Sequence, residues 1–275
     1  MLLKKWLNRV LYPLILFFSL LWTQEVLLAA NPPNKTSTKK YVHNPHVPLT
    51  VWQQLEPYFL PIDHPIKSKL DHLFHSKRIT LNKKTFEAAG FAPIHERAPT
   101  NVIIGRHPKL KGYIIKAYLD TQPAFYEWAV LMDRIRGAES IRSCLKRHQY
   151  KQFVVPRKWL YPLPCDPSPP SGSYNRKNFI LIVEDMQILD HPANLKAYQK
   201  KITPQILNAL YTILKEEGLL DSVYLDNIPF TRLGQIAFID TEHYHKEPID
   251  YLKLKPFFSA SMQRYWQTLV EKGGP

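Results

Sequence analysis

Two oxygen-bearing side chains, Asn227 and Asp240, stand at the ends of a stretch that has the pattern of a loop, a turn and a short strand. The loop ends at Asn227, the turn lies at 232–234, and the apolar segment 235–239 leads directly into Asp240. Carboxamide and carboxylate oxygens are hard ligands of the kind that Mg²⁺ prefers, with water or phosphate oxygens completing the octahedron. The stretch therefore predicts a divalent-cation site at Asn227 and Asp240.

A lone cation, Lys116, lies within an apolar stretch that is predicted to form a β-strand. Segments 101–105 and 112–118 have the apolar and β-branched residues of two strands, and a basic turn joins them. A lysine in this setting has two interpretations. Either it holds an anionic ligand in the interior, or it is an edge-strand side chain that points to water.

Two glutamates lie on the helices that are predicted after this strand. Pro123 fits the first turn of an amphipathic helix that continues to Arg136, and Glu127 lies on that helix. Gly137 is expected to end it, so that Glu139 begins the next helix. Both glutamates thus follow the strand of Lys116 in the chain.

The following part of the chain alternates strands with helices. Strands are predicted at 152–155, 158–161 and 178–183, with an exposed loop rich in Pro, Ser and Gly before the last of them. Thr203 is a predicted N-cap, the helix after it presents one apolar face, and Gly218 ends that helix. The order is strand, helix, strands, helix, and then the stretch that contains the two oxygen ligands.

This order resembles that of the protein-kinase-like superfamily. Asn227 and Asp240 resemble its catalytic-loop Asn and metal-binding Asp, and the phrase Ile-Asp-Thr-Glu at 239–242 is closer to the Asp-aromatic-Glu of aminoglycoside and small-molecule kinases than to Asp-Phe-Gly. The resemblance covers 101–245. It implies Mg²⁺ or Mn²⁺ with ATP as cofactors, with Asn227, Asp240 and Glu242 as metal ligands.

The same resemblance implies roles for four residues around the nucleotide. Lys116 would hold the phosphates, and Glu127 would pair with it, with Glu139 as the alternative. Glu184 and Met186 would flank the hinge, whose backbone groups contact adenine.

Two expected parts of such a site are missing from the sequence. The acceptor-orienting aspartate should lie five residues before Asn227, where the chain has Ser222, and Asp221 comes one residue too early. Either Asp221 serves as the catalytic base after a small loop rearrangement, or the base is lost. Gly105 and Gly112 are too far apart to form a glycine-rich phosphate loop.

The resemblance implies an α+β fold with two lobes, a small antiparallel sheet lobe and a short helical lobe. The predicted segments are a signal peptide at 1–30, a flexible linker at 31–48, a helical N-terminal extension at 49–98, a kinase-like N-lobe at 99–188 and a C-lobe at 189–275. The signal prediction depends on early basic residues, an apolar run at 10–22 and small residues at the exit. It predicts an exported protein, periplasmic or secreted; an uncleaved segment would instead anchor the chain in the inner membrane.

Charge and cysteine content limit the partners. Lys and Arg exceed Asp and Glu by 37 to 23, giving a formal charge of +14 without a concentrated basic block. This favours a nucleotide, an acidic protein or a host partner over nucleic acid, and a membrane only if the signal segment stays in place. Cys144 and Cys165 either form a disulfide or stay as two thiols, and two cysteines alone do not predict a zinc site.

The sequence therefore predicts an exported, degenerate kinase-like protein that binds a nucleotide and a divalent metal. Two activities stay open. One is ATP-dependent phosphotransfer without the usual catalytic Asp. The other is a non-catalytic pseudokinase scaffold that binds a partner through its basic surface.

Overall fold

The structure, a computed structural model, describes residues 41–96 and 102–275. The predicted signal peptide at 1–30 and the part of the predicted linker at 31–40 lie outside the described residues. In the described ranges, no helix has the length and apolar character that crossing a membrane requires.

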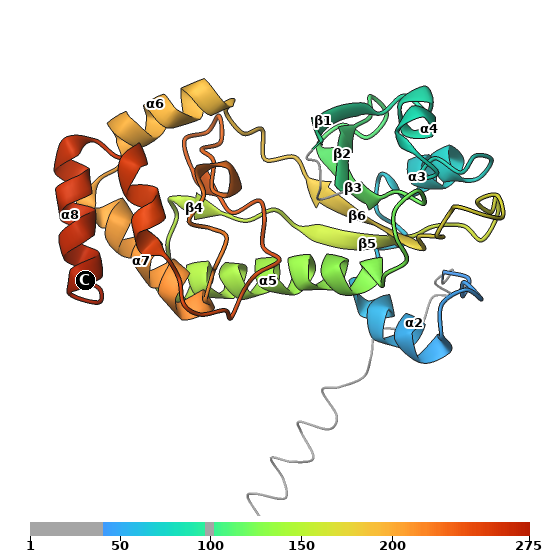
Figure 1. Ribbon diagram of the computed structural model, residues 1–275, viewed down its shortest axis with the longest axis horizontal. Helices are drawn as coiled ribbons and strands as arrows, with labels where there is room; N and C mark the ends of the chain where they lie inside the picture. The colour runs from blue at the N-terminus through green and yellow to red at the C-terminus, as the bar shows by residue number, and fades with distance from the viewer. Residues whose placement is uncertain (1–40, 97–101) are drawn as a thin grey trace, which may run out of the picture. The chain divides into compact units, whose positions relative to one another are not determined.

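A five-stranded antiparallel sheet, in the order β1-β2-β3-β6-β5, is the main β-structure of this α+β fold (Figure 1). Its strands are β1 (Ala92–Glu96), β2 (Val102–Arg106), β3 (Tyr113–Tyr118), β6 (Phe179–Glu184) and β5 (Lys158–Pro162). Strands β3 and β6 are nearly continuous apolar runs, as expected for strands that are covered on both faces. Lys116 lies opposite Ile104 on one side and Leu181 on the other, so it belongs to the central strand and not to an edge.

Helices cover both faces of the sheet. On one face, α3 (Lys67–Phe74) and α4 (Lys83–Ala88) bury Leu70, Phe74 and Phe86 against β-strand side chains such as Ile115 and Ile182. On the other face, α2 (Leu49–Leu55) packs beside α5, followed by the short 3-10 helix η1 (Glu56–Tyr58). The predicted helical extension at 49–98 is therefore helical only in its first part, because β1 lies within it and pairs with β2.

Residues 41–48 differ from the flexible linker that their composition predicts. The Tyr41 hydroxyl donates to the Leu60 carbonyl at 2.9 Å, and Val47 is buried in the same core as Trp52. Asn44 is buried as well and donates to the Asn178 side chain at 3.3 Å. A few buried side chains are enough to dock this polar segment.

One long helix, α5 (Glu127–His148), joins two cores (Figure 1). Leu131 and Ile135 pack against the sheet, whereas Ile141 and Cys144 belong to the core of the helical part. The helix continues through Gly137, where the sequence predicts a break between two helices. It begins at Glu127, four residues after Pro123.

The helical part contains α6 (His191–Lys201), α7 (Pro204–Glu217), η2 (Leu225–Asn227), η3 (Tyr251–Phe257) and α8 (Ala260–Glu271), and a parallel pair formed by β4 (Phe153–Val154) and β7 (Ile236–Ala237). The bounds of α7 confirm the prediction, because Thr203 accepts a hydrogen bond from the Ile206 N–H at 3.3 Å and Gly218 ends the helix with a φ of 57°. Helix α6, which begins at the N-cap Asp190, is not predicted from the sequence.

Candidate functional site

The segment after β7 carries Asp240 and Glu242 to the junction of β3, β5 and α5. Hydrogen bonds hold the backbone of this segment at Ile239. The Ile239 N–H donates to the Asn227 carbonyl at 3.0 Å. The Ile239 carbonyl accepts from Lys116 Nζ and from Lys158 Nζ, each at 3.4 Å. Thr241 then accepts from Lys158 Nζ at 2.6 Å and donates to the Arg134 carbonyl at 2.5 Å. The two carboxylates are thus held beside three cations.

Gly137 explains how α5 approaches this segment so closely. A Cβ atom at position 137 would lie 1.9 Å from the Thr241 carbonyl oxygen, far inside van der Waals contact. Only glycine lets the helix and the segment meet here. The glycine that is predicted to end a helix is instead the contact point that brings Arg134, one turn earlier, to the carboxylates.

Arg134 forms ion pairs with both Asp240 and Glu242. It is 7% exposed, so its guanidinium group has little water to replace these partners. The helix after the lysine strand therefore contributes a cation to the site, where the resemblance implies a carboxylate.

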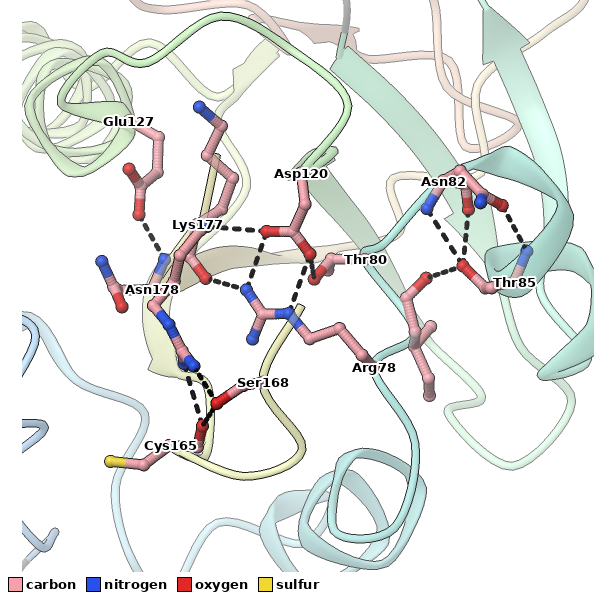
Figure 2. A network of polar contacts seen from close by, with 12 residues as sticks. Arg78, Thr80, Asn82, Thr85, Asp120, Glu127, Cys165, Ser168, Lys177 and Asn178 are labelled. Carbon is pink, nitrogen blue, oxygen red and sulfur yellow. Dashed lines mark hydrogen bonds and ion pairs between the residues drawn. The ribbon is translucent and has the colours of Figure 1, made fainter. Parts of the chain in front are cut away.

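The predicted partner of Lys116, Glu127, lies elsewhere. It accepts a hydrogen bond from the backbone N–H of Asn178 at 2.5 Å (Figure 2) and a second from the backbone N–H of Phe179 at 3.3 Å. Seven residues separate it from Arg134, which is about 10 Å along a helix. The charges that act on Lys116 are those of Asp240, Arg134 and Glu242, so the predicted pairing of Glu127 with Lys116 is corrected to a cap on the start of β6.

The electrostatics of the cluster disfavour the charged form of its two lysines and favour the charged form of Asp240. Burial lowers the pKa of Lys116 to about 8, although Asp240 raises it, and burial together with the charge of Lys116 lowers the pKa of Lys158 well below its usual value. Burial raises the pKa of Asp240, but the charges of Lys116, Arg134 and Lys158 outweigh this effect and bring the pKa down to about 2. The positive charges of the two buried lysines are thus unfavourable as they stand, so an anionic ligand that pairs with them would be stabilised here.

Asp221 lies in the loop after α7, and Asn227 is the last residue of the short helix η2 that follows it. Asn227 Nδ2 donates to the Asp221 carbonyl at 2.8 Å, and its Oδ1 accepts no hydrogen bond from the residues that the structure describes. Asp221 Oδ2 lies 2.5 Å from His243 Nδ1, and both side chains are partly open to solvent. His243, which the sequence prediction does not assign to the site, also lowers the pKa of Asp240 through its charge.

Glu184 and Met186 are at the far end of the same sheet strands. In the antiparallel register Glu184 pairs with Tyr113, three residues from Lys116, which is about 10 Å along the strand. Glu184 accepts from the Arg157 N–H at 2.8 Å, and Met186 follows it in a half-buried turn. They do not join the charged cluster, and their predicted role, backbone contacts with adenine, does not require that they do.

The structure thus brings together Lys116, Asp240 and Glu242, with Asn227 and Asp221 on the adjoining loop, and it adds Arg134, Lys158 and His243. Such a cluster can hold a phosphate-like anion between buried cations. No protein-family model matches the chain, and no curated protein matches it. The assignment of this site therefore depends on the geometry and charge of the chain itself.

Proposed function

We propose that this protein is a degenerate kinase-like protein that binds the phosphates of a nucleotide at Lys116. The observation that supports this most is the meeting of Lys116, on the central strand β3, with Asp240, which comes more than one hundred residues later. The chain forms an antiparallel sheet, a helix packed on it and then a helical part. This order agrees with the two-lobed arrangement that the resemblance implies. The two buried lysines and Arg134 supply the donors for phosphate oxygens.

A divalent cation fits the oxygens of the site but not their surroundings. Asp240, Glu242 and Asn227 carry hard oxygen ligands by type. However, both carboxylates already pair with Arg134, and Lys116 lies beside them, so a further cation would have to compete with these basic groups for the same oxygens. The residues fit a phosphate, and they do not fit Mg²⁺ or Mn²⁺ while Arg134 keeps its place; we assign no step to the metal.

Asp221 and His243 are the groups that could accept a proton if the site transfers phosphate. They are hydrogen-bonded to each other at the solvent-facing side of the cluster, where an acceptor hydroxyl has access. The predicted role of Asp221 as catalytic base is thus proposed for the pair. Loss of ATP turnover in Asp221→Asn, with ATP binding retained, would support that role.

The test of nucleotide binding is a thermal-shift titration of the full chain with ATP, with and without excess EDTA. We expect ATP to raise the Tm in EDTA as well as in Mg²⁺, by the equivalent of about 2.7 kcal/mol at a concentration of one hundred Kd. Lys116→Met should abolish the rise. The matched control is Lys177→Met, which removes another buried lysine, whose Nζ donates to the Pro123 carbonyl and to no residue of the cluster.

Two results would contradict the proposal. One is the absence of any shift with wild type at millimolar ATP. The other is a shift that survives in Lys116→Met, because the nucleotide would then bind elsewhere.

A second candidate function is that of a non-catalytic scaffold for an acidic partner. A cavity of about 180 Å³ opens beside the cluster, and its lining includes Glu139, Arg142, Arg157, Lys158 and Trp159. Its three basic side chains outnumber its one carboxylate and suit an acidic side chain, and its volume is too small for a nucleotide. Binding of a poly-glutamate peptide that is lost in Arg157→Ala but kept in Lys116→Met would favour this function.

The location of such a partner follows from the predicted signal peptide. If that peptide exports the chain, the acidic partner is extracytoplasmic or in a host.

A further inference from the structure

Cys144, His148 and Glu216 form a second cluster, at the C-terminal end of α5. Cys144 and His148 are one helical turn apart on α5, and Glu216 comes from the last turn of α7. His148 Nε2 lies 2.9 Å from Glu216 Oε1, and Cys144 Sγ lies 3.7 Å from Glu216 Oε2. One ligand atom from each residue, a sulfur, a nitrogen and an oxygen, lies within 4.8 Å of the other two.

We propose that these three side chains bind a zinc-type transition metal ion that joins α5 to α7. Thiolate, imidazole and carboxylate together are the ligands that Zn²⁺ takes in proteins, and three protein ligands leave a fourth position for water. Zinc bonds of about 2.0–2.3 Å at tetrahedral angles place the ligand atoms roughly 3.4–3.6 Å apart. The two observed separations of 2.9 and 3.7 Å lie on either side of that range.

The adjustment that binding requires falls on the two partly exposed side chains. The His148 and Glu216 side chains are 30% and 36% exposed, so they have room to turn toward a metal ion, whereas Cys144 is buried. As the sulfur–metal bond forms, the S–H bond of Cys144 breaks and its proton goes to solvent, with no change in oxidation state.

Arg147 is a positioning residue for this cluster. It donates to Glu216 Oε2 at 2.6 Å and to Glu217 Oε1 at 3.3 Å. A metal ion would take one oxygen of Glu216, and Arg147 keeps Glu217 as its second partner. Oriented carboxylate ligands of this kind are common around metal ions.

Binding would fix the two helices that frame the candidate nucleotide site. Helix α5 carries Arg134, and α7 leads into the loop of Asp221 and Asn227. The metal proposal does not depend on the proposed function, because the two sites share no ligand.

The test uses the full chain, treated with a chelator and kept reduced, and titrated with Co²⁺ and Zn²⁺. We expect one equivalent of Co²⁺ to produce a thiolate-to-cobalt charge-transfer band, and Zn²⁺ to displace it and raise the Tm. Cys144→Ser should remove the band, while Cys165→Ser, the matched control at the other free cysteine, should keep it. His148→Ala and Glu216→Gln should weaken Zn²⁺ binding at least about tenfold, since even indirect partners of a metal contribute 10–100-fold.

Several results would overturn the proposal. The proposal is wrong if the wild-type protein takes up no stoichiometric Co²⁺ or Zn²⁺. It is also wrong if the charge-transfer band depends on Cys165. Because Cys144 is buried, its serine variant could fail to fold; unchanged Zn²⁺ affinity in His148→Ala, which alters a partly exposed side chain, is then the deciding outcome.

Discussion

The ammonium group of Lys116 is kept inside the protein although its charge is unfavourable there. Its pKa of about 8 lies below the usual 10.5, because the loss of water outweighs the attraction of Asp240. The difference corresponds to about 3 kcal/mol of folding free energy that is lost when the lysine is protonated. A residue that is retained at such a cost to stability is a candidate for function.

This cost predicts how stability depends on pH. Between about pH 8 and 10.5, Lys116 is protonated in the unfolded chain and neutral in the folded chain. The free energy of unfolding that this residue contributes therefore rises with pH between these two values. Urea denaturation at about pH 7.5 and 9.5 should show a steeper rise for wild type than for Lys116→Met. Equal slopes would mean that Lys116 is not the titrating group.

Arg134 is predicted to exclude divalent cations from the two carboxylates. In Arg134→Gln, Asp240 and Glu242 lose a shared partner, and we expect Mn²⁺ to bind at least about tenfold more tightly, which is 1.4 kcal/mol. Calorimetric titration with Mn²⁺ measures the change. Arg142→Gln, which alters an arginine of the same helix that donates to the Pro156 carbonyl, is the control and should bind Mn²⁺ as wild type does. A Kd that is unchanged in Arg134→Gln would show that other charges exclude the ion.

At the scale of elements, the position of α5 depends on residue 137 being a glycine. Because Gly137 touches the Thr241 carbonyl, the helix and the segment 240–242 form one unit. The register of this contact decides which residue of the helix reaches the carboxylates.

Gly137→Ala should therefore destabilise the protein, although alanine is the better helix former by roughly 0.5–1 kcal/mol. The methyl group would displace backbone atoms, and we expect a loss of about 3 kcal/mol, at the upper end for overpacking. Gly112→Ala, where a methyl group meets nothing within 4 Å but φ is +84°, should lose only about 1–2 kcal/mol. The reverse order in urea denaturation would contradict the close contact.

The elements that the sequence predicts well are those with local signals. Thr203 and Gly218 mark the two ends of α7, and the apolar run around Lys116 marks β3, because caps and strand patterns act within a few residues. Arg134 and Glu127 could not be assigned in this way. Both are polar residues on one helix, and only the close approach at Gly137 determines which of them meets Asp240.

The Cys144 cluster was missed for a related reason. Cysteine counting considers only sulfur ligands, whereas the third ligand, Glu216, comes from a helix that is about seventy residues further along the chain. A cysteine and a histidine one turn apart on a predicted helix are the signal that could have identified it.

At the scale of the whole described unit, a buried ion pair ties the segment before α4 to the sheet (Figure 2). Arg78 donates twice to Asp120, at 2.8 Å each, and Asp120 also accepts from the Lys177 N–H at 2.8 Å. Asp120 is completely buried. This network connects α3 and α4 to the ends of β3 and β6.

Breaking this pair should be costly. Asp120→Asn leaves the guanidinium group of Arg78 with an uncompensated charge, and we expect a loss of about 3–5 kcal/mol in urea denaturation. Glu87→Gln, which removes one partner of an exposed pair with Lys83, should change stability by less than about 1 kcal/mol. Similar losses in the two variants would indicate that the Arg78 pair is far more hydrated than its burial suggests.

The docking of residues 41–48 sets where the chain can be shortened. A polypeptide that starts at Leu49 would keep every helix and strand named above, yet it would lose Val47 from its place beside Trp52 and the tyrosine that caps the carbonyl of Leu60. We expect it to be less soluble and to melt at a lower temperature than one that starts at Tyr41. Thermal melts of the two polypeptides measure the difference, and equal melting temperatures would contradict the docking of residues 41–48.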